Sequence, residues 1–201
     1  VETPFIADIL EQNGISNIAT SGARIITSLD AVIQQNTVLG LRQHLSQLEV
    51  RLSGYQRAQV QDDYKKIEYQ GDEEFVPGNF VFGVVKAIDD SRDKGPEVRV
   101  LFDDGRLEGV IDATGLTRLA DAYAKFTRGG AKAAMADRKA LAKQLQVGDK
   151  VYTSIRSRAE AGGLLLNLER YPQVEGAAFV VQEGAVRGMS GGMSNLNFNR
   201  A

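Results

Sequence analysis

One serine and one lysine in this sequence have the spacing of an acylating pair. Ser91-Arg-Asp-Lys94 fits Ser-x-x-Lys, in which the serine attacks a carbonyl carbon and the lysine serves as its base. That chemistry needs the serine at the start of a helix, in a dry pocket, with the lysine one turn later. Here the pair lies in a charged segment that ends in Gly95-Pro96. We therefore interpret it as a solvated turn between two strands.

The other candidate groups are weaker. Ser194-Asn195 lacks the third-position Asn of a Ser-x-Asn motif, because Leu196 stands there, and no Lys-Thr-Gly occurs. The glycines from Gly188 to Gly192 do not form a phosphate-binding Gly-x-Gly-x-x-Gly. His44 lies on a predicted helix with no partner in the pattern, which indicates a surface or packing role. The paired carboxylates lie in predicted turns, where Asp serves turn geometry and solubility; they are Asp72-Glu73-Glu74, Asp89-Asp90 and Asp103-Asp104.

Composition limits the classes of site that the chain can build. With 201 residues it holds one or two domains, and a net charge of −2 gives it no global attraction to nucleic acid or anionic membrane. The absence of Cys excludes disulfides and thiolate metal sites, and the single His excludes poly-histidine sites. No apolar run approaches the roughly 20 residues that cross a bilayer. We predict no catalytic, cofactor-binding or metal-binding residue in this chain.

The first part of the chain predicts helix, strand and helix. Thr3-Pro4 begins a helix that ends at Gly14, and residues 22–29 form a strand. Asp30 then caps a long helix over residues 31–52. Its apolar stripe predicts the buried face; the stripe consists of Val32, Val38, Leu41, Leu45, Leu48 and Leu52. A polar segment follows, and Val76-Pro77-Gly78 marks a domain boundary.

The middle of the chain predicts a five-stranded barrel. Three strands precede a helical connection and two follow it, which is the order of an OB fold, a Greek-key barrel. The strands are residues 79–88, 97–102, 106–111, 151–155 and 164–168, and the helices between the third and fourth are residues 116–126 and 131–145. Glycines inside the strands suit the sharp bends of a small barrel.

The last stretch, residues 174–192, predicts two short strands joined by a tight turn at Glu183-Gly184. The fold class is therefore α+β, with an OB-like barrel over residues 76–172. The barrel is inserted in a small discontinuous α/β lobe made of residues 1–75 and 173–201.

Two interpretations of the barrel surface stay open. Between Arg118 and Lys150 eight Lys and Arg stand against three Asp, a net charge of +5. Together with the aromatic residues Phe80, Phe82 and Tyr152, this predicts a site for single-stranded nucleic acid, RNA in particular. In the alternative, Phe80, Phe82, Val84 and Ile88 share one strand parity and simply face the barrel interior.

The two ends of the chain resemble class A penicillin-binding proteins, the bifunctional peptidoglycan synthases. Residues 174–181, 184–192 and Phe198-Asn-Arg-Ala201 resemble the start of their transpeptidase domain. Residues 23–30, Ala-Arg-Ile-Ile-Thr-Ser-Leu-Asp, resemble the segment that follows their glycosyltransferase domain, as do Thr3-Pro4-Phe5-Ile6. Some members of the family insert an OB-like domain between these segments. Gly188, Ser190, Ser28 and the short Gln182-Glu183-Gly184 turn depart from the family pattern, which indicates a divergent branch.

The resemblance implies a membrane-anchored parent at the extracytoplasmic, periplasmic face, which polymerises lipid II and cross-links peptide stems through an acyl-serine. In the family the acylating Ser-x-x-Lys follows Phe-Asn-Arg-Ala by about ten residues. The resemblance thus places it after Ala201, and the glycosyltransferase carboxylates before Val1. The implied role of this chain is to space and orient the two catalytic domains, with a cell-wall regulator protein as an expected partner.

Overall fold

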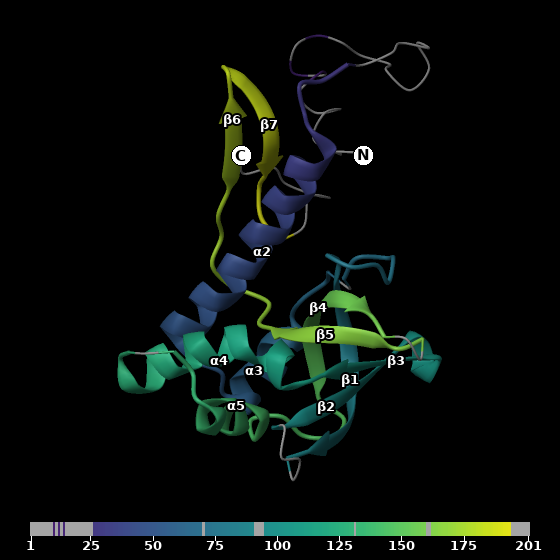
Figure 1. Ribbon diagram of the computed structural model, residues 1–201, viewed down its shortest axis with the longest axis vertical. Coiled ribbons are helices and arrows are strands. Elements are labelled where there is room, and N and C mark those ends of the chain that lie inside the picture. Colours follow the sequence, from purple (N-terminus) through teal and green to yellow (C-terminus); the bar gives the residue numbers. More distant parts are fainter. Residues whose placement is uncertain are drawn as a thin grey trace. The chain divides into compact units, whose positions relative to one another are not determined.

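The computed structural model describes residues 10, 12, 14, 26–69, 71–90, 95–130, 132–159 and 162–193. The chain divides into two compact units, residues 43–174 and residues 1–42 with 175–201. The predicted first helix is not described as an element, and residues 22–25 of the predicted first strand lie outside the described part of the chain. Figure 1 labels the described elements.

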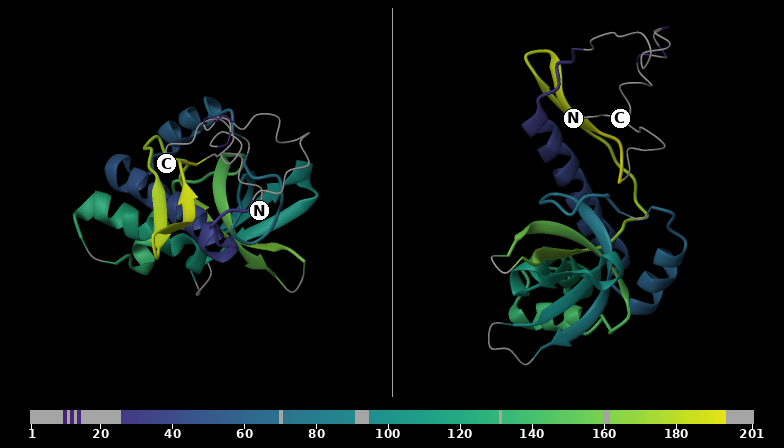
Figure 2. Two further views of the ribbon diagram at one scale, coloured as in Figure 1. Left: turned by 90° about the horizontal axis from the view of Figure 1, so that it is seen from above. Right: turned by 90° about the vertical axis from the view of Figure 1, so that its right-hand side faces the viewer.

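Residues 43–174 contain a closed five-stranded barrel in the order β1-β2-β3-β5-β4. The β3–β5 pair is parallel and the other pairs are antiparallel. Both views of Figure 2 show these strands curving round one another. The order confirms the predicted α+β class with an OB-like barrel. The strands are β1 Phe80–Asp89, β2 Glu97–Phe102, β3 Leu107–Ile111, β4 Lys150–Arg158 and β5 Leu164–Glu169.

Glycines inside the strands let neighbouring side chains fill the barrel. A Cβ added at Gly83 on β1 would lie 2.5 Å from side-chain atoms of both Val100 and Phe102. A Cβ added at Gly109 on β3 would lie 2.6 Å from Leu166. Since both glycines point their missing side chains inward, the larger neighbours take that volume.

Helix α4, Ala113–Arg128, connects β3 to β4 together with α5, Met135–Ala142. Asp112 caps α4 by accepting a hydrogen bond from the Gly115 backbone N–H at 2.7 Å. This cap starts the helix three residues before the predicted start at residue 116. Both helices were predicted, but α5 is shorter than the predicted 131–145, because residues 132–134 are not helical and residues 143 and 144 form a turn.

Helix α2, Ala31–Ser53, has nearly the predicted bounds, but its predicted apolar stripe is only partly buried, since Leu45 is buried and three other members are not. Val32, Leu48 and Leu52 of the apolar stripe are exposed. The buried residues are largely polar, because each of several polar side chains reaches a backbone or side-chain partner on another segment; they are Gln34, Thr37, Arg42, Ser46 and Glu49 with Leu45 and Val50. A charged helix that the sequence did not predict, α3 Arg57–Lys65, follows and buries only Val60 and Tyr64.

The unit formed by residues 1–42 and 175–201 contains the predicted hairpin. Strands β6, Ala178–Gln182, and β7, Ala185–Ser190, pair antiparallel. Glu183 and Gly184 have φ angles of 53° and 75°, both left-handed, as a type I′ turn requires. The predicted strand over residues 22–29 is wrong for its described part, residues 26–29, which form no strand. Those residues instead hydrogen-bond to β7, since the Ser28 hydroxyl donates to the Val186 carbonyl at 2.7 Å.

The approach of α4 to β5 gives a test of the packing. A Cβ at Gly115 would lie 2.1 Å from the Leu166 carbonyl oxygen, which is backbone and cannot turn aside. We expect Gly115→Ala to lower the free energy of unfolding by about 2–4 kcal/mol, because the helix must shift off the strand. The measurement is urea unfolding followed by far-UV circular dichroism.

Gly40→Ala is the matched control. An added Cβ at Gly40, in the middle of α2, meets no atom within 4 Å. It should leave the stability unchanged or raise it by up to about 1 kcal/mol, since Ala favours a helix over Gly. Equal effects of the two substitutions would contradict the close approach at Gly115.

Candidate functional site

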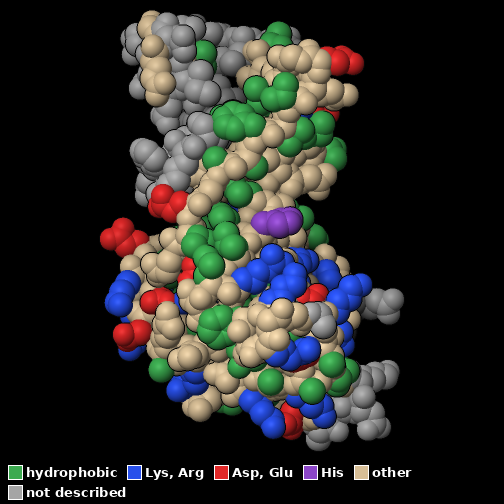
Figure 3. All heavy atoms as spheres, turned by 90° about the vertical axis from the view of Figure 1, so that its left-hand side faces the viewer, with side chains coloured by type: hydrophobic (Ala, Val, Ile, Leu, Met, Phe, Trp, Pro, Cys, Tyr) green, Lys and Arg blue, Asp and Glu red, His purple; other side chains and the backbone are tan. Residues whose placement is uncertain are grey.

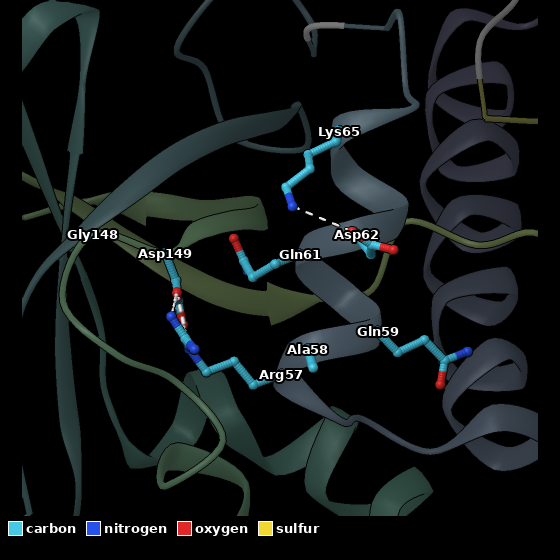
Figure 4. Close-up of a pocket in the computed structure, with 8 residues that line it drawn as sticks. All are labelled: Arg57, Ala58, Gln59, Gln61, Asp62, Lys65, Gly148 and Asp149. Carbon is cyan, nitrogen blue, oxygen red and sulfur yellow. Dashed lines mark hydrogen bonds and ion pairs between the residues drawn. The ribbon is translucent and has the colours of Figure 1, made fainter.

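A shallow groove lies between α3 and the loop that leads into β4. Its volume is about 710 Å³. Figure 4 shows the side chains of α3 along one wall and Asp149 on the other, with Arg57 directed at Asp149. It is lined by Arg57, Ala58, Gln59, Gln61, Asp62, Lys65, Gly148 and Asp149.

The polar groups of this groove hold α3 on the barrel. The Arg57 guanidinium donates to both carboxylate oxygens of Asp149, with its Nη2 2.7 Å from Oδ1 and its Nε 2.8 Å from Oδ2. The Gln61 amide donates to the Lys150 carbonyl at 2.9 Å and accepts from the Lys150 N–H at 3.0 Å. Lys65 pairs with Asp62 at 3.2 Å. Since these groups bind one another, the groove is a joint between helix and barrel and offers no poised acid, base or nucleophile.

A carboxylate is buried where α2 and α4 pack on the barrel. Glu169, at the end of β5, accepts hydrogen bonds from the hydroxyls of Ser46 at 2.7 Å and Ser154 at 2.8 Å. Arg118 on α4 has its Nη1 3.4 Å from the carboxylate oxygen that accepts from Ser154. Asn167 donates in turn to the Ser154 hydroxyl at 3.0 Å. We call these five residues the Glu169 cluster, which joins two helices and two strands.

Burial sets the protonation of this carboxyl. Removal from water raises the pKa of Glu169 above its ordinary value of 4.5, and the bonds from Ser46, Arg118 and Ser154 oppose that rise. A serine beside a carboxylate can belong to a catalytic pair. Here Ser46 and Ser154 are fully buried and donate to the carboxylate, so no substrate reaches them. The Glu169 cluster is therefore structural.

A second hydrophobic layer lies outside the barrel, under α3. The ring of Phe82 packs 4.7 Å from that of Tyr152 and 5.3 Å from that of Tyr64 on α3, measured between centroids. Tyr171 lies 5.3 Å from Tyr152. This layer consists of alternate residues of β1 and β4. Gly83 and the other residues of β1 that alternate with Phe80 and Phe82 face the barrel interior.

The position of these aromatic rings bears on both interpretations of the barrel surface. The alternative in which these side chains face the barrel interior is wrong. Phe80 and Phe82 lie in the outer layer, and Val84 is exposed. Phe80 and Tyr152 are nevertheless fully buried, so neither presents a ring face for base stacking. Phe82 is half-buried and carries the Lys150 ammonium 4.3 Å from its ring centroid. The aromatic half of the nucleic-acid prediction therefore has no exposed platform at these positions.

The basic residues of the predicted patch divide into paired and exposed groups. Arg128 forms a two-point contact with Asp137, with its Nη2 2.6 Å from Oδ2, and Arg118 belongs to the Glu169 cluster. Asp149 is neutralised by Arg57 from outside the patch. Figure 3 shows Lys and Arg side chains gathered on one face of the molecule. Besides the paired Arg128, the exposed members are Lys125, Lys132 and Lys143.

The remaining candidate residues do not assemble into one site. Asp103 and Asp104 form a tight turn with left-handed φ angles of 47° and 52°. Asp72 accepts from the Phe80 N–H at 2.8 Å and so closes a loop onto β1. His44 is exposed on α2. Ser91 to Lys94, Ser194-Asn195 and Phe198 to Ala201 lie outside the described residues.

Two further features were searched for over the described ranges. Within them, no three His, Asp or Glu side chains come together as a metal site. No helix in that part of the chain is long and apolar enough to cross a membrane.

Neither comparison with known proteins gives a match: no family model matches the sequence, and no curated protein does. The resemblance of the chain ends to penicillin-binding proteins stays a prediction from the residues.

The raised pKa of Glu169 predicts a pH dependence. The folded state holds the Glu169 proton more tightly than the unfolded chain, so the stability from this group is complete below pH 4.5 and declines as the pH rises. We expect the free energy of unfolding of the wild type to fall, relative to Glu169→Gln, as the pH rises above about 4.5. Urea unfolding across this range, followed by circular dichroism, measures the difference.

Glu108→Gln is a control for which the stability should change with pH in the opposite direction. The hydrogen bond from Lys86, at 2.6 Å, lowers the pKa of this exposed carboxyl. Its contribution to stability is present above the unfolded pKa and is lost as the pH falls below about 4.5. A constant difference between wild type and Glu169→Gln at every pH would show that Glu169 titrates alike in both states.

Proposed function

We propose that this chain is a non-catalytic part of a class A penicillin-binding protein, a bifunctional peptidoglycan synthase. In this proposal the OB-like barrel is an insert that spaces and orients the glycosyltransferase and transpeptidase domains and docks a cell-wall regulator. The acyl-serine chemistry belongs to the parent, at the extracytoplasmic face of the membrane. The chain itself binds and positions.

The observation that carries the proposal is a set of hydrogen bonds between the two stretches that resemble the family. Ser28 and Asp30 belong to the first stretch, and Val186 and Arg187 to the second. The Ser28 hydroxyl donates to the Val186 carbonyl at 2.7 Å, and the Asp30 N–H donates to the Arg187 carbonyl at 2.9 Å. The Arg187 guanidinium donates a hydrogen bond to the Ser28 carbonyl at 3.1 Å. Two motifs nearly 160 residues apart therefore form one structural unit, as the flanks of an inserted domain must.

The packing of β7 on α2 supports the same proposal. Gly188, which departs from the commoner residue of the family, lies where an added Cβ would be 2.5 Å from the Thr37 hydroxyl. The Gln34 side chain both donates to the Met189 carbonyl and accepts from its N–H, each at 2.8 Å. The glycine thus suits a close contact between helix and strand, and the departure has a local cause.

The exposed apolar residues of β6 favour a sheet with more strands than this hairpin. On β6, Phe179 is 53% exposed and Val181 is 60% exposed. An isolated two-stranded hairpin is marginally stable in water, and a third strand or a covering helix normally buries such residues. This is the surface expected of the first strands of a transpeptidase sheet, whose further strands would cover them.

A labelling experiment tests the proposal. We expect a Ser-x-x-Lys codon series about ten codons beyond Ala201 in the coding sequence, as the family resemblance implies. A protein extended through that motif and the rest of its domain should be acylated by fluorescent penicillin, and replacement of that serine by Ala should abolish labelling. The 201-residue chain should remain unlabelled. The readout is in-gel fluorescence after denaturation.

Two results would contradict the proposal. The first is a stop codon directly after codon 201, or an extended protein with no acylated serine. The second is labelling of the 201-residue chain that Ser91→Ala removes, because the acylating pair would then be Ser91 and Lys94.

A further inference from the structure

Positive charge is concentrated in the part of the chain that forms α4 and α5. The net charge of +5 over residues 118–150 leaves −7 on the rest of the chain, because the total is −2. Figure 1 places α4 and α5 on one side of the barrel, and Figure 3 shows that side, with Lys and Arg side chains gathered on it. The charge is therefore segregated, and this side can attract anions although the whole chain is slightly acidic.

Two acids of this region are bound locally and do not pair with its lysines. Asp121 on α4 accepts from the Ala133 N–H at 2.6 Å. Asp137 on α5 accepts from the Ala134 N–H at 2.7 Å and pairs with Arg128. Since these carboxylates hold the connection between the two helices, they are not available to the lysines around them.

Five cations on this side are accessible to an anion. None of them forms an ion pair with a residue that the structure describes. Lys139 is half-buried, and the other four are exposed. We call these five the basic face; it consists of Arg51, Lys125, Lys132, Lys139 and Lys143.

A backbone bond brings the connection between α4 and α5 onto this side. Because the Ala133 N–H donates to Asp121, the neighbouring Lys132 lies beside α4. Lys125 is on the same side of α4, since it follows Asp121 by one helical turn. Two lysines from different segments thus lie near one another.

The end of α2 runs alongside α4 and adds Arg51 to the basic face. The Glu169 cluster joins the two helices at one point. Further along, Gly54 lies against the ring of Phe126, where an added Cβ would be 2.6 Å from the ring. Arg51 precedes Gly54 by three residues and is exposed beside the last turn of α4.

We propose that the basic face binds an anionic lipid surface, with its ammonium groups among the lipid phosphates. Four of the five cations are Lys, whose compact charge suits a diffuse layer of phosphates, whereas Arg is favoured where two hydrogen bonds join one group. Phe126 of α4 is 43% exposed and Met135 of α5 is 38% exposed. Such apolar side chains enter the boundary between headgroups and acyl chains.

Two other anionic partners fit the basic face less well. Single-stranded nucleic acid needs several rings on which its bases stack, and the exposed ring that α4 and α5 offer is Phe126 alone. An acidic protein surface is normally met by Arg and aromatic side chains, because Lys is depleted in protein interfaces. The inference deepens the orienting role in the proposed function and rests on it for the presence of a membrane.

The test is flotation of the 201-residue chain with lipid vesicles. We expect the chain to bind vesicles that contain roughly one third phosphatidylglycerol, and not to bind vesicles of pure phosphatidylcholine. Binding at about 50 mM salt should be lost at about 500 mM, because salt screens exposed charges. Lys125→Gln with Lys132→Gln and Lys143→Gln should weaken binding at least about tenfold, since each removed charge reduces the attraction.

A matched variant separates the basic face from the net charge. Lys65→Gln with Lys66→Gln and Arg106→Gln removes the same number of exposed charges from the end of α3 and the turn before β3. It should alter vesicle binding less than about twofold, since these charges lie outside the basic face. Circular dichroism confirms that both triple variants fold.

Several results would overturn the inference. One is no binding to the phosphatidylglycerol vesicles, or equal loss of binding in the two triple variants. Another is competition by inorganic phosphate at the same ionic strength, which would indicate a discrete anion site. A third is stronger binding of the basic face to an RNA of about 20 nucleotides or to a polyglutamate peptide than to the vesicles. Penicillin labelling of the extended protein does not involve the basic face, so the inference and the proposed function can fail separately.

Discussion

The structure depends on polar side chains of helix α2 that satisfy the backbone of distant strands. Within the first unit, Gln34 bonds both the N–H and the carbonyl of Met189. Within the barrel unit, the Ser46 hydroxyl accepts from the Arg170 N–H at 2.8 Å and donates to Glu169, and the Glu49 carboxylate accepts from the Gln173 N–H at 2.8 Å. An unsatisfied buried polar group costs about 1–3 kcal/mol, so each of these bonds specifies where the chain must run. Apolar contacts could hold the same segments but would tolerate a shift along the helix.

The same constraint explains why α2 carries its leucines outward. A helix that buries Gln34, Ser46 and Glu49 has given its inward face to hydrogen bonds, and only a few apolar residues such as Val50 share that face. The apolar residues that remain, Leu48 among them, lie on the sides that water reaches.

The sequence predicted the parts of the fold that depend on local patterns. Strand alternation, the Glu183-Gly184 turn and the capping Asp30 are signals that depend on only a few neighbouring residues. Each predicted an element with nearly its observed bounds. The parts that failed depend on long-range partners. The inward face of α2 could not be predicted, because Ser46 is buried only through its bond to Glu169, 123 residues away. Helix α3 was missed because its sequence is mostly polar, and two buried residues with the Arg57–Asp149 pair hold it. The candidate sites share this limit: Glu169 carries no motif, so only the fold brings its partners together.

The two stretches that carry the predicted resemblance contact each other, because β7 hydrogen-bonds to the start of α2. Sequence similarity at the two ends of a chain is weak evidence when each stretch is short, because turns and glycines recur in unrelated proteins. Backbone bonds between the stretches are a stronger constraint, since Asp30 and Arg187 must both keep their register for the N–H of one to reach the carbonyl of the other. Gly188 adds a steric condition at the same place, because a side chain there would displace Thr37. The glycine at position 188 therefore has a local steric cause, since it lies against Thr37 of α2.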